Sequence, residues 1–474
     1  MSAFDTIITA KNARPIWKKL SESIVPIVSK IDLAGMDAAM DRLRSDIRQN
    51  RYIPSIGHGY LGYLKAAGCT RFVPILTAED MTVFYLIVLS LQEYLIEDFD
   101  GVYGAYRSVP KTARKSKEPE KEDDIIDPYF RDTFSRKAWF KDWSQFTDLL
   151  TATCNDSSVG NYVVVSDIAN FYDTIDIGRL INGIRSKVSG NEEIVSLLGY
   201  FLNYWDRRIK GYSASSKGIP QEIISDASRI VSNFYLNEFD RRFIDYCGTQ
   251  GVLYIRWADD IVIFGKSKLH LERVMHSASR FLLNIGLNFN ASKTKHFSRR
   301  EFQEYRALDL LSAISSKNAP AFEKELRRFA TRYPYKGGRV DTVVKASLNF
   351  LSGEPRARSL YAMNYMQERL SEYEFLSTLN ESQLLKKYLL FGNITKEIRK
   401  DIELILRHPY AAPRATFLSF IAKYSKRLIA EGVKTTAIKS FVDRIEGFLR
   451  IAKLHCQFVF LPRGRRFRAA TVIL

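Results

Sequence analysis

Three aspartates in this 474-residue chain, Asp167, Asp259 and Asp260, stand directly beside short runs of apolar residues. A carboxylate in such surroundings costs free energy unless another group compensates its charge. Carboxylate oxygens are the ligands that Mg²⁺ and Mn²⁺ prefer. Two such ions held about 3.5–4 Å apart can activate an attacking hydroxyl and stabilise a leaving pyrophosphate in one in-line step. The three aspartates are therefore candidate ligands of two divalent ions.

Each aspartate taken alone also has a simpler explanation. Asp often occurs in tight turns, so Asp259 and Asp260 could serve only to close a hairpin. Asp167 could simply cap whatever follows its strand. The choice between these explanations depends on the elements and motifs around the three residues.

The runs next to the aspartates predict β-strands. Residues 162–165 are a β-branched run typical of a buried strand. Residues 253–257 and 261–264 are two short β-rich runs around Ala-Asp-Asp, which predicts a hairpin with the carboxylates at its tip. Between these strands, residues 223–243 have the pattern of a long helix.

The remaining sequence indicates mostly helices. Apolar residues recur at helical spacing over residues 1–50 and 77–99. A charged, proline-bounded segment at 110–128 is expected to be an exposed insertion. Strand patterns become scarce beyond about residue 297. The last third predicts helices at 323–333, 359–376, 398–407 and 436–451, followed by a basic tail at 463–468.

The composition favours a polyanionic partner. Lys and Arg outnumber Asp and Glu by 71 to 53, which gives a net charge of +18; a basic protein with no nucleic-acid partner would look the same on charge alone. Four scattered cysteines without C-x-x-C spacing argue against a zinc site or a disulfide framework. Since neither a signal peptide nor a membrane-spanning run is apparent, we expect a cytoplasmic protein with no membrane partner.

Four segments, in this order, resemble motifs A to D of reverse transcriptases. Motif A has a metal-binding Asp before an aromatic pair, motif B has Pro-Gln, motif C has an aromatic before Ala-Asp-Asp, and motif D has Lys-Thr. The matching segments are VSDIANFYDTI at 165–175, GIPQE at 218–222, RWADD at 256–260 and GLNFNASKT at 286–294. Looser matches to the fingers motifs lie at 71–80 and 103–107. The resemblance therefore covers about residues 70–297.

The resemblance implies an α+β fold, in which reverse-transcriptase fingers and a palm built of an antiparallel sheet packed on helices precede an all-helical C-terminal domain. The implied domains are an N-terminal helical segment and start of the fingers at 1–70, fingers with the charged insertion at 71–160, the palm with motifs A to D at 161–297, and the helical domain at 298–474.

The resemblance also implies roles for individual residues. Asp167 and Asp259 would bind both metal ions, with the backbone carbonyl of Ile168 close by, and Asp260 would complete or support the pair. Tyr172 matches the side chain that lies beneath the sugar and excludes a 2′-hydroxyl, which implies deoxynucleoside triphosphates as substrates.

Further residues would contact the nucleotide. Gln221 and Gly218 would lie against the template or the nucleotide, where a glycine lets the backbone approach closely. Lys293 would approach the pyrophosphate and act as general acid. Arg71 is the candidate fingers residue for the triphosphate, through charge-assisted hydrogen bonds.

Departures from the family pattern narrow the resemblance. Glu222 replaces the glycine of Pro-Gln-Gly, where a template strand passes, and Trp257 replaces the usual Tyr or Phe. With its helical C-terminal part, the chain resembles bacterial abortive-infection (Abi) reverse transcriptases of the defence-associated group, and most closely the smaller prophage-encoded ones. That resemblance implies antiphage defence, homo-oligomers, and untemplated DNA synthesis primed from a tyrosine, with the DNA product attached to protein.

Other functions stay open. A templated reverse transcriptase of the retron or group II intron type would use an RNA template. A non-catalytic scaffold that binds nucleic acid is the non-enzymatic alternative, and three intact aspartates argue against it. A viral-type RNA polymerase is disfavoured by Ala258, which stands where such enzymes have glycine, and by Tyr172.

Overall fold

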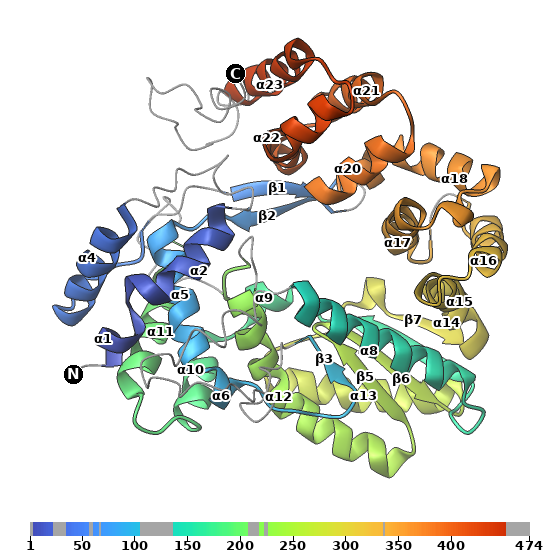
Figure 1. Cartoon of the computed structure of the whole chain (residues 1–474). Helices are drawn as coiled ribbons and strands as arrows, with labels where there is room; N and C mark the ends of the chain where they lie inside the picture. Colours follow the sequence, from blue (N-terminus) through green and yellow to red (C-terminus); the bar gives the residue numbers. More distant parts are fainter. Residues whose placement is uncertain are drawn as a thin grey trace, which may run out of the picture. The chain divides into compact units, whose positions relative to one another are not determined.

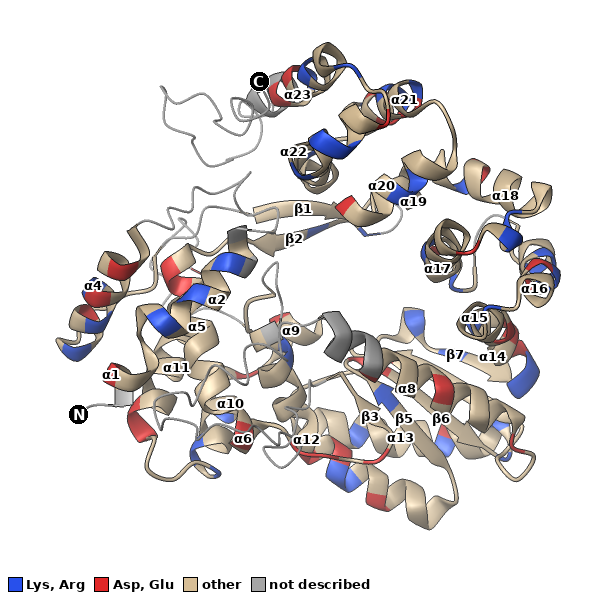
Figure 2. Cartoon of the chain, in the orientation of Figure 1, with Lys and Arg blue, Asp and Glu red and all other residues tan. Residues whose placement is uncertain are grey.

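A computed structural model describes residues 3–21, 35–55, 60–65, 68–104, 136–206, 218–221, 226–334 and 337–451. The chain divides into two compact units. We call residues 1–22, 31–57 and 76–302 the sheet unit, and residues 23–30, 58–75 and 303–474 the helical unit. Figure 1 shows both, and Figure 2 shows that Lys and Arg occur throughout the two units. None of the described helices is both long and apolar enough to span a membrane.

Among the described residues, the sheet unit is built on five strands in the order β3-β5-β6-β4-β7, of which β3, β5, β6 and β7 are labelled in Figure 1. The strands β5, β6, β4 and β7 pair antiparallel with their neighbours, and only β3 runs parallel to β5. Their apolar runs are fully buried on the central strands, as the β-branched sequence predicts. The strands are β3 (Val102–Tyr103), β4 (Tyr162–Asp167), β5 (Leu253–Trp257), β6 (Asp260–Gly265) and β7 (Lys295–Ser298).

Helices pack on this sheet and around one buried helix. Helix α13 contacts β4 and β6, and helix α12 contacts β5. Helix α5 is apolar on all sides and buried along most of its length, as expected of a helix surrounded by others. The helices are α1 (Ala3–Ile7), α2 (Ala10–Ser21), α4 (Met36–Arg48), α5 (Ala78–Ser90), α6 (Gln92–Leu95), α8 (Arg136–Asn155), α9 (Phe171–Thr174), α10 (Ile177–Arg185), α11 (Glu192–Tyr204), α12 (Asp226–Gln250) and α13 (Lys268–Asn284).

In the residues that the structure describes, the helical unit contains the hairpin of β1 and β2 and a succession of helices. Several of these helices start at a residue whose side-chain oxygen accepts from a backbone N–H of the first turn. At the start of α20, Asn380 and Gln383 form a capping box, in which each side chain accepts from the other's backbone N–H. The elements are β1 (Tyr60–Leu64), β2 (Thr70–Pro74), α15 (Leu308–Ser315), α16 (Ala319–Arg332), α17 (Val340–Gly353), α18 (Leu360–Leu370), α19 (Tyr373–Leu376), α20 (Glu381–Leu390), α21 (Ile394–Leu406), α22 (Ala411–Ala430) and α23 (Thr435–Ile451); α14 (Arg299–Arg306) links the units along the chain.

The α+β prediction is confirmed, since an antiparallel sheet packed on helices precedes a helical region. The strands and the hairpin expected around the three aspartates form, and so do the helices expected at 323–333, 398–407 and 436–451, whereas the segment 359–376 forms two helices, α18 and α19. The expected insertion at 110–128 and the basic tail at 463–468 lie outside the described residues.

One expected boundary differs from the structure. The predicted division between residues 70 and 71 falls inside β2, because β1 and β2 pair as a hairpin. That hairpin packs on α22, and the Tyr410 hydroxyl donates to the Gly68 carbonyl at 3.2 Å. Packing partners more than 300 residues away therefore assign this segment to the helical unit, and no local pattern shows that.

Candidate active site

Strand register brings the three aspartates to one end of the sheet. Strands β4 and β6 pair antiparallel so that Asp167 lies opposite Asp260. Strands β5 and β6 pair so that Trp257 lies opposite Asp260, which leaves Ala258 and Asp259 as a two-residue turn. The predicted hairpin tip therefore stands directly beside the end of β4.

The turn has an unusual backbone. Ala258 has φ +51°, in the left-handed region that costs a residue with a Cβ about 1–2 kcal/mol. The Ala258 N–H donates to the Tyr103 carbonyl at 3.1 Å. A Cβ on Gly104 would come within 2.9 Å of the Ala258 nitrogen, so only glycine fits there. The end of β3 thus packs closely against the turn and supports its shape.

The electrostatics show that the carboxylates crowd each other. Burial, followed by the negative charges of Asp167 and Asp260 and a hydrogen bond shared with Asp167, raises the pKa of Asp259 to about 7. Asp167 is only 6% exposed. Its Oδ2 accepts a hydrogen bond from Lys293 Nζ at 2.6 Å. In this structure the Lys293 ammonium therefore compensates one of the negative charges.

This donor set fits a magnesium ion. In the parts of the chain that the structure describes, no three His, Cys, Asp or Glu side chains are grouped as metal ligands. Mg²⁺ needs fewer, because it commonly takes one or two carboxylates and completes its shell with water and substrate phosphates. Asp167 lies opposite Asp260, and Asp259 precedes Asp260 in the turn. A divalent cation would offset the burial and the repulsion that raise the pKa of Asp259.

The segment of motif D is tied to the end of β4. The Asn290 N–H donates to the Asp167 carbonyl at 2.7 Å, and the Ser166 and Thr294 hydroxyls are 2.7 Å apart. Ile168 forms a bridge with Phe289 and is buried. These contacts flank the short 3₁₀ turn Ala291–Lys293 and bring Lys293 to Asp167.

The structure also joins the segments of motifs A and B. The Ile219 N–H donates to the Tyr172 carbonyl at 2.9 Å. Gly218 has φ +64°, and a Cβ there would collide with that carbonyl and with the backbone of Asp173. Glycine is therefore required at 218 by a contact within the sheet unit. Gln221, half-buried, follows on the same loop, and Glu222 lies outside the described residues.

Arg71 belongs to the helical unit, where it lies exposed on β2 opposite Tyr63, whereas the three aspartates belong to the sheet unit. Burial raises the pKa of Tyr63 to about 12, and the positive charge of Arg71 partly opposes this rise.

Sequence reasoning gave no role to Arg256, which is fully buried directly beneath the turn. Its Nε donates to Asp240 Oδ1 at 2.9 Å, and its Nη2 pairs with Asp240 Oδ2. Its Nη1 donates to Asn233 Oδ1 at 2.8 Å and to the Ala258 carbonyl at 2.6 Å. Burial acts to lower the pKa of Arg256, but Asp240 and Tyr254 raise it above its ordinary value, so the side chain stays charged. The available signal was the seven-residue spacing of Asn233 and Asp240, which puts both on one helix face.

Trp257 packs in an aromatic cluster. Its ring lies 5.0 Å from Trp143 and 5.4 Å from Phe146, both on α8, and Tyr103 lies 5.8 Å from Phe146. The large Trp257 side chain, which replaces the usual Tyr or Phe, therefore packs α8 against the turn.

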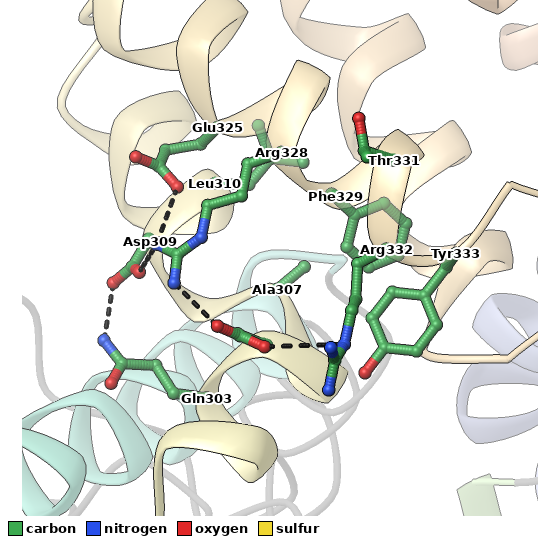
Figure 3. A pocket seen from close by; sticks show the side chains of 11 residues that line it. Gln303, Ala307, Asp309, Leu310, Glu325, Arg328, Phe329, Thr331, Arg332 and Tyr333 are labelled. Carbon is green, nitrogen blue, oxygen red and sulfur yellow. Dashed lines mark hydrogen bonds and ion pairs between the residues drawn. The ribbon is translucent and has the colours of Figure 1, made fainter.

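A separate pocket of about 460 Å³ lies in the helical unit, on α14 to α16 (Figure 3). Arg328 and Arg332 line it, and both pair with Glu304, at 2.7 and 3.7 Å. Arg328 also lies 3.5 Å from Asp309 and from Glu325. Because carboxylates neutralise its arginines, we do not assign phosphate chemistry to this pocket.

Comparison with known proteins agrees with the geometry. Residues 124–330 match the family model described as reverse transcriptase (RNA-dependent DNA polymerase). Among curated proteins, the chain is 25% identical to the retron Ec83 reverse transcriptase of Escherichia coli, over 43% of this chain and 62% of that protein. It is 22% identical to protein YkfC of Escherichia coli strain K12, over 35% of this chain and 54% of that protein. The chain thus matches less than two thirds of the length of either relative.

Solved telomerase structures are similar at a lower level. Telomerase from Candida tropicalis with a fragment of telomeric RNA is 10% identical over 75% of this chain and 68% of that chain, with a TM-score of 0.32. The apo form is 13% identical over 88% of this chain and 70% of that chain, with a TM-score of 0.31.

The family match includes all three aspartates, Tyr172, Gln221 and Lys293, and it excludes Arg71. Residues 124–330 are thus similar to reverse transcriptases, the class of nucleotidyltransferases that polymerise DNA.

Proposed function

We propose that this chain is a DNA polymerase that joins deoxynucleotides at Asp167, Asp259 and Asp260. One observation carries the proposal: in the region that matches the reverse-transcriptase model, strand register sets Asp167 opposite Asp260 beside the hairpin tip, and burial together with these neighbouring charges raises the pKa of Asp259 to about 7. A perturbed carboxylate in such a place is expected of a site that binds divalent cations.

Asp167 and Asp259, with the Ile168 carbonyl, would hold two Mg²⁺ or Mn²⁺ ions, and Asp260 would support them. When bound, such ions activate an attacking hydroxyl and neutralise phosphate charge. Lys293, now on Asp167, would be freed when a metal replaces it. Its ammonium would then face the pyrophosphate and donate a proton to it.

Tyr172 and Gln221 would contact the incoming nucleotide. The Tyr172 ring is proposed to lie beneath the sugar and to exclude a 2′-hydroxyl, and the Ile219 N–H holds its backbone. Gln221 follows on the same loop. The role of Arg71 on the triphosphate would require the helical unit to present β2 to the nucleotide.

We further propose that synthesis needs no template, starts from a tyrosine hydroxyl and leaves DNA attached to protein, in a cytoplasmic homo-oligomer that defends against phage. Support comes from Glu222, which puts a side chain and a negative charge where these enzymes have glycine beside the template. The resemblance to abortive-infection reverse transcriptases, including the prophage-encoded ones, supports the defence role.

A second candidate is a templated RNA-dependent DNA polymerase. The similarity to the retron Ec83 reverse transcriptase favours it. The net charge of +18 would suit a structured RNA partner.

The test uses purified protein with Mg²⁺ and labelled deoxynucleotides, with neither template nor primer, beside an Asp259→Ala control. Products are separated on a denaturing gel with and without protease. We expect label that stays with the protein until digestion and is lost in the control. Synthesis only after a primed template is added would establish the second candidate, and no synthesis under either condition would leave a nucleic-acid-binding scaffold.

A further inference from the structure

The turn Ala258–Asp259 needs contacts that stabilise it, because an alanine such as Ala258 rarely adopts a left-handed backbone by itself. A left-handed residue with a Cβ persists only where its surroundings hold it. The Ala258 N–H is held by Tyr103 and its carbonyl by Arg256. The peptide that follows Ala258 is planar, so a bond to its carbonyl also sets the direction in which Asp259 leaves the turn.

The guanidinium of Arg256 is suited to this task. It is rigid, planar and always charged, and its five N–H groups point in fixed directions. Two of its nitrogens bind Asp240 and the third reaches both Asn233 and the Ala258 carbonyl. Both Arg256 and Asp240 are 0% exposed, so water does not compete for these bonds.

Asp240 and Asn233 lie on α12, the helix that starts shortly after the motif B segment. Their spacing of seven residues sets both on the face toward β5. The Tyr254 hydroxyl, also on β5, donates to Asp240 Oδ1 at 2.7 Å and helps to fix the orientation of this carboxylate. The guanidinium therefore connects α12 to the peptide that carries Asp259.

We propose that Arg256, oriented by Asp240 and Asn233, is the positioning residue that aims the Asp259 carboxylate at the divalent ions. The inference rests on the proposed polymerase function and extends it to a buried network that touches neither nucleotide nor metal. It requires that loss of the bond to Ala258 weaken metal binding even where the fold is intact.

The decisive variant replaces the pair by apolar residues, Asp240→Leu with Arg256→Met, because such replacement of a buried ion pair often leaves stability unchanged or improved. A second variant, Arg256→Lys, keeps the positive charge beside Asp240 but lacks the planar fork. The matched control is Lys387→Met with Asp401→Leu, which removes a buried ion pair of the helical unit. All three start from the full chain, stripped of metal.

Binding of Mn²⁺ alone is measured by electron paramagnetic resonance, and the Mg²⁺ concentration for half-maximal nucleotide incorporation is measured in parallel. We expect both to weaken by about 10-fold or more in the two Arg256 variants, as for residues that orient metal ligands, and to change less than about twofold in the control. Circular dichroism and thermal unfolding establish which variants are folded.

A folded Arg256 variant that binds Mn²⁺ with wild-type affinity would overturn the inference, and so would equal weakening in the control. If wild-type protein binds Mn²⁺ through Asp259 but incorporates no nucleotide, the proposed function fails while the positioning role is still tested by the binding data.

Discussion

The sheet unit and the helical unit each contain a buried trio of a cation, a carboxylate and a tyrosine. In the sheet unit Arg256 pairs with Asp240, which accepts from the Tyr254 hydroxyl at 2.7 Å. In the helical unit Lys387 pairs with Asp401, which accepts from the Tyr388 hydroxyl at 2.8 Å.

The two trios differ in what else the cation reaches. Lys387 also donates to the Leu370 carbonyl at the end of α18, and this bond only connects helices to each other. Burial lowers the pKa of Lys387 and raises that of Asp401, so both groups are pushed toward their neutral forms. Arg256 stays charged and extends its fork to the turn that carries Asp259. The same chemical device is therefore structural in one unit and linked to the site in the other.

Removing one cation at a time should give the largest effects. Arg256→Met and Lys387→Met each leave a buried carboxylate without its cation, so each should lose about 3–5 kcal/mol of unfolding free energy. Only Arg256→Met should also raise the Mg²⁺ concentration for half-maximal nucleotide incorporation, by about 10-fold or more. Chemical denaturation and incorporation assays at matched folded fractions measure both, and an Arg256→Met enzyme with the wild-type Mg²⁺ requirement would contradict the comparison.

The next effect concerns the carboxylate at the turn. The pKa of Asp259 is raised to about 7, above the value near 3.9 of an unfolded chain. The folded state therefore holds an extra proton between these values, and stability falls as pH rises from about 4 to 7. By pH 7, where the group is half ionised, this loss of stability is on the order of 4 kcal/mol.

Asp259→Asn should therefore make the metal-free protein more stable than wild type at pH 7, with the difference vanishing below about pH 4, and it should abolish activity. Mg²⁺ should raise the melting temperature of wild type but not of this variant. Asp443→Asn, an exposed change in the helical unit, controls for loss of one negative charge and should keep the response to Mg²⁺. A variant no more stable than wild type at pH 7 would argue against crowded carboxylates.

A glycine pair compares the units at smaller scale. Gly218 and Gly392 both have positive φ, but only Gly218 faces another backbone where its Cβ would be. Gly392→Ala should cost about 1–2 kcal/mol through strain alone. Gly218→Ala should cost about 3 kcal/mol or more, since the Tyr172 segment must move as well. If both variants lose the same unfolding free energy in thermal unfolding, the Tyr172 segment can move aside at little cost.

The smallest effect is expected from two alanines with nearly the same φ. Ala258 has φ +51° at the turn, and Ala307 has φ +53° before α15. Replacing either with glycine relieves strain but adds unfolded-state entropy, so stability should change by less than about 1 kcal/mol. Only Ala258→Gly should lower activity, by a few-fold, because the turn becomes less rigid. Equal activity in both variants would show that the rigidity of the turn does not affect catalysis.

Much of the fold followed from local patterns. The alternating and β-branched runs predicted β4 and the β5–β6 hairpin, since side-chain period and turn residues act within a few residues. The same patterns put Asp167 at a strand end and Asp259 at a hairpin tip. Arg71 was grouped with the fingers because motif resemblance follows chain order, whereas β2 pairs with β1, which packs on α22 far along the chain.

By itself, the sequence determined which elements form around the three aspartates and which residues are candidates for the chemistry, because propensity, periodicity and motif order are local properties. Only the tertiary structure decided that Lys293 neutralises Asp167 across 126 residues, that Gly218 must clear the Tyr172 carbonyl, and that Arg256 holds the Ala258 carbonyl. These contacts depend on strand register and on helix packing, and burial gives them their strength, because a charge removed from water interacts strongly with whatever lies beside it.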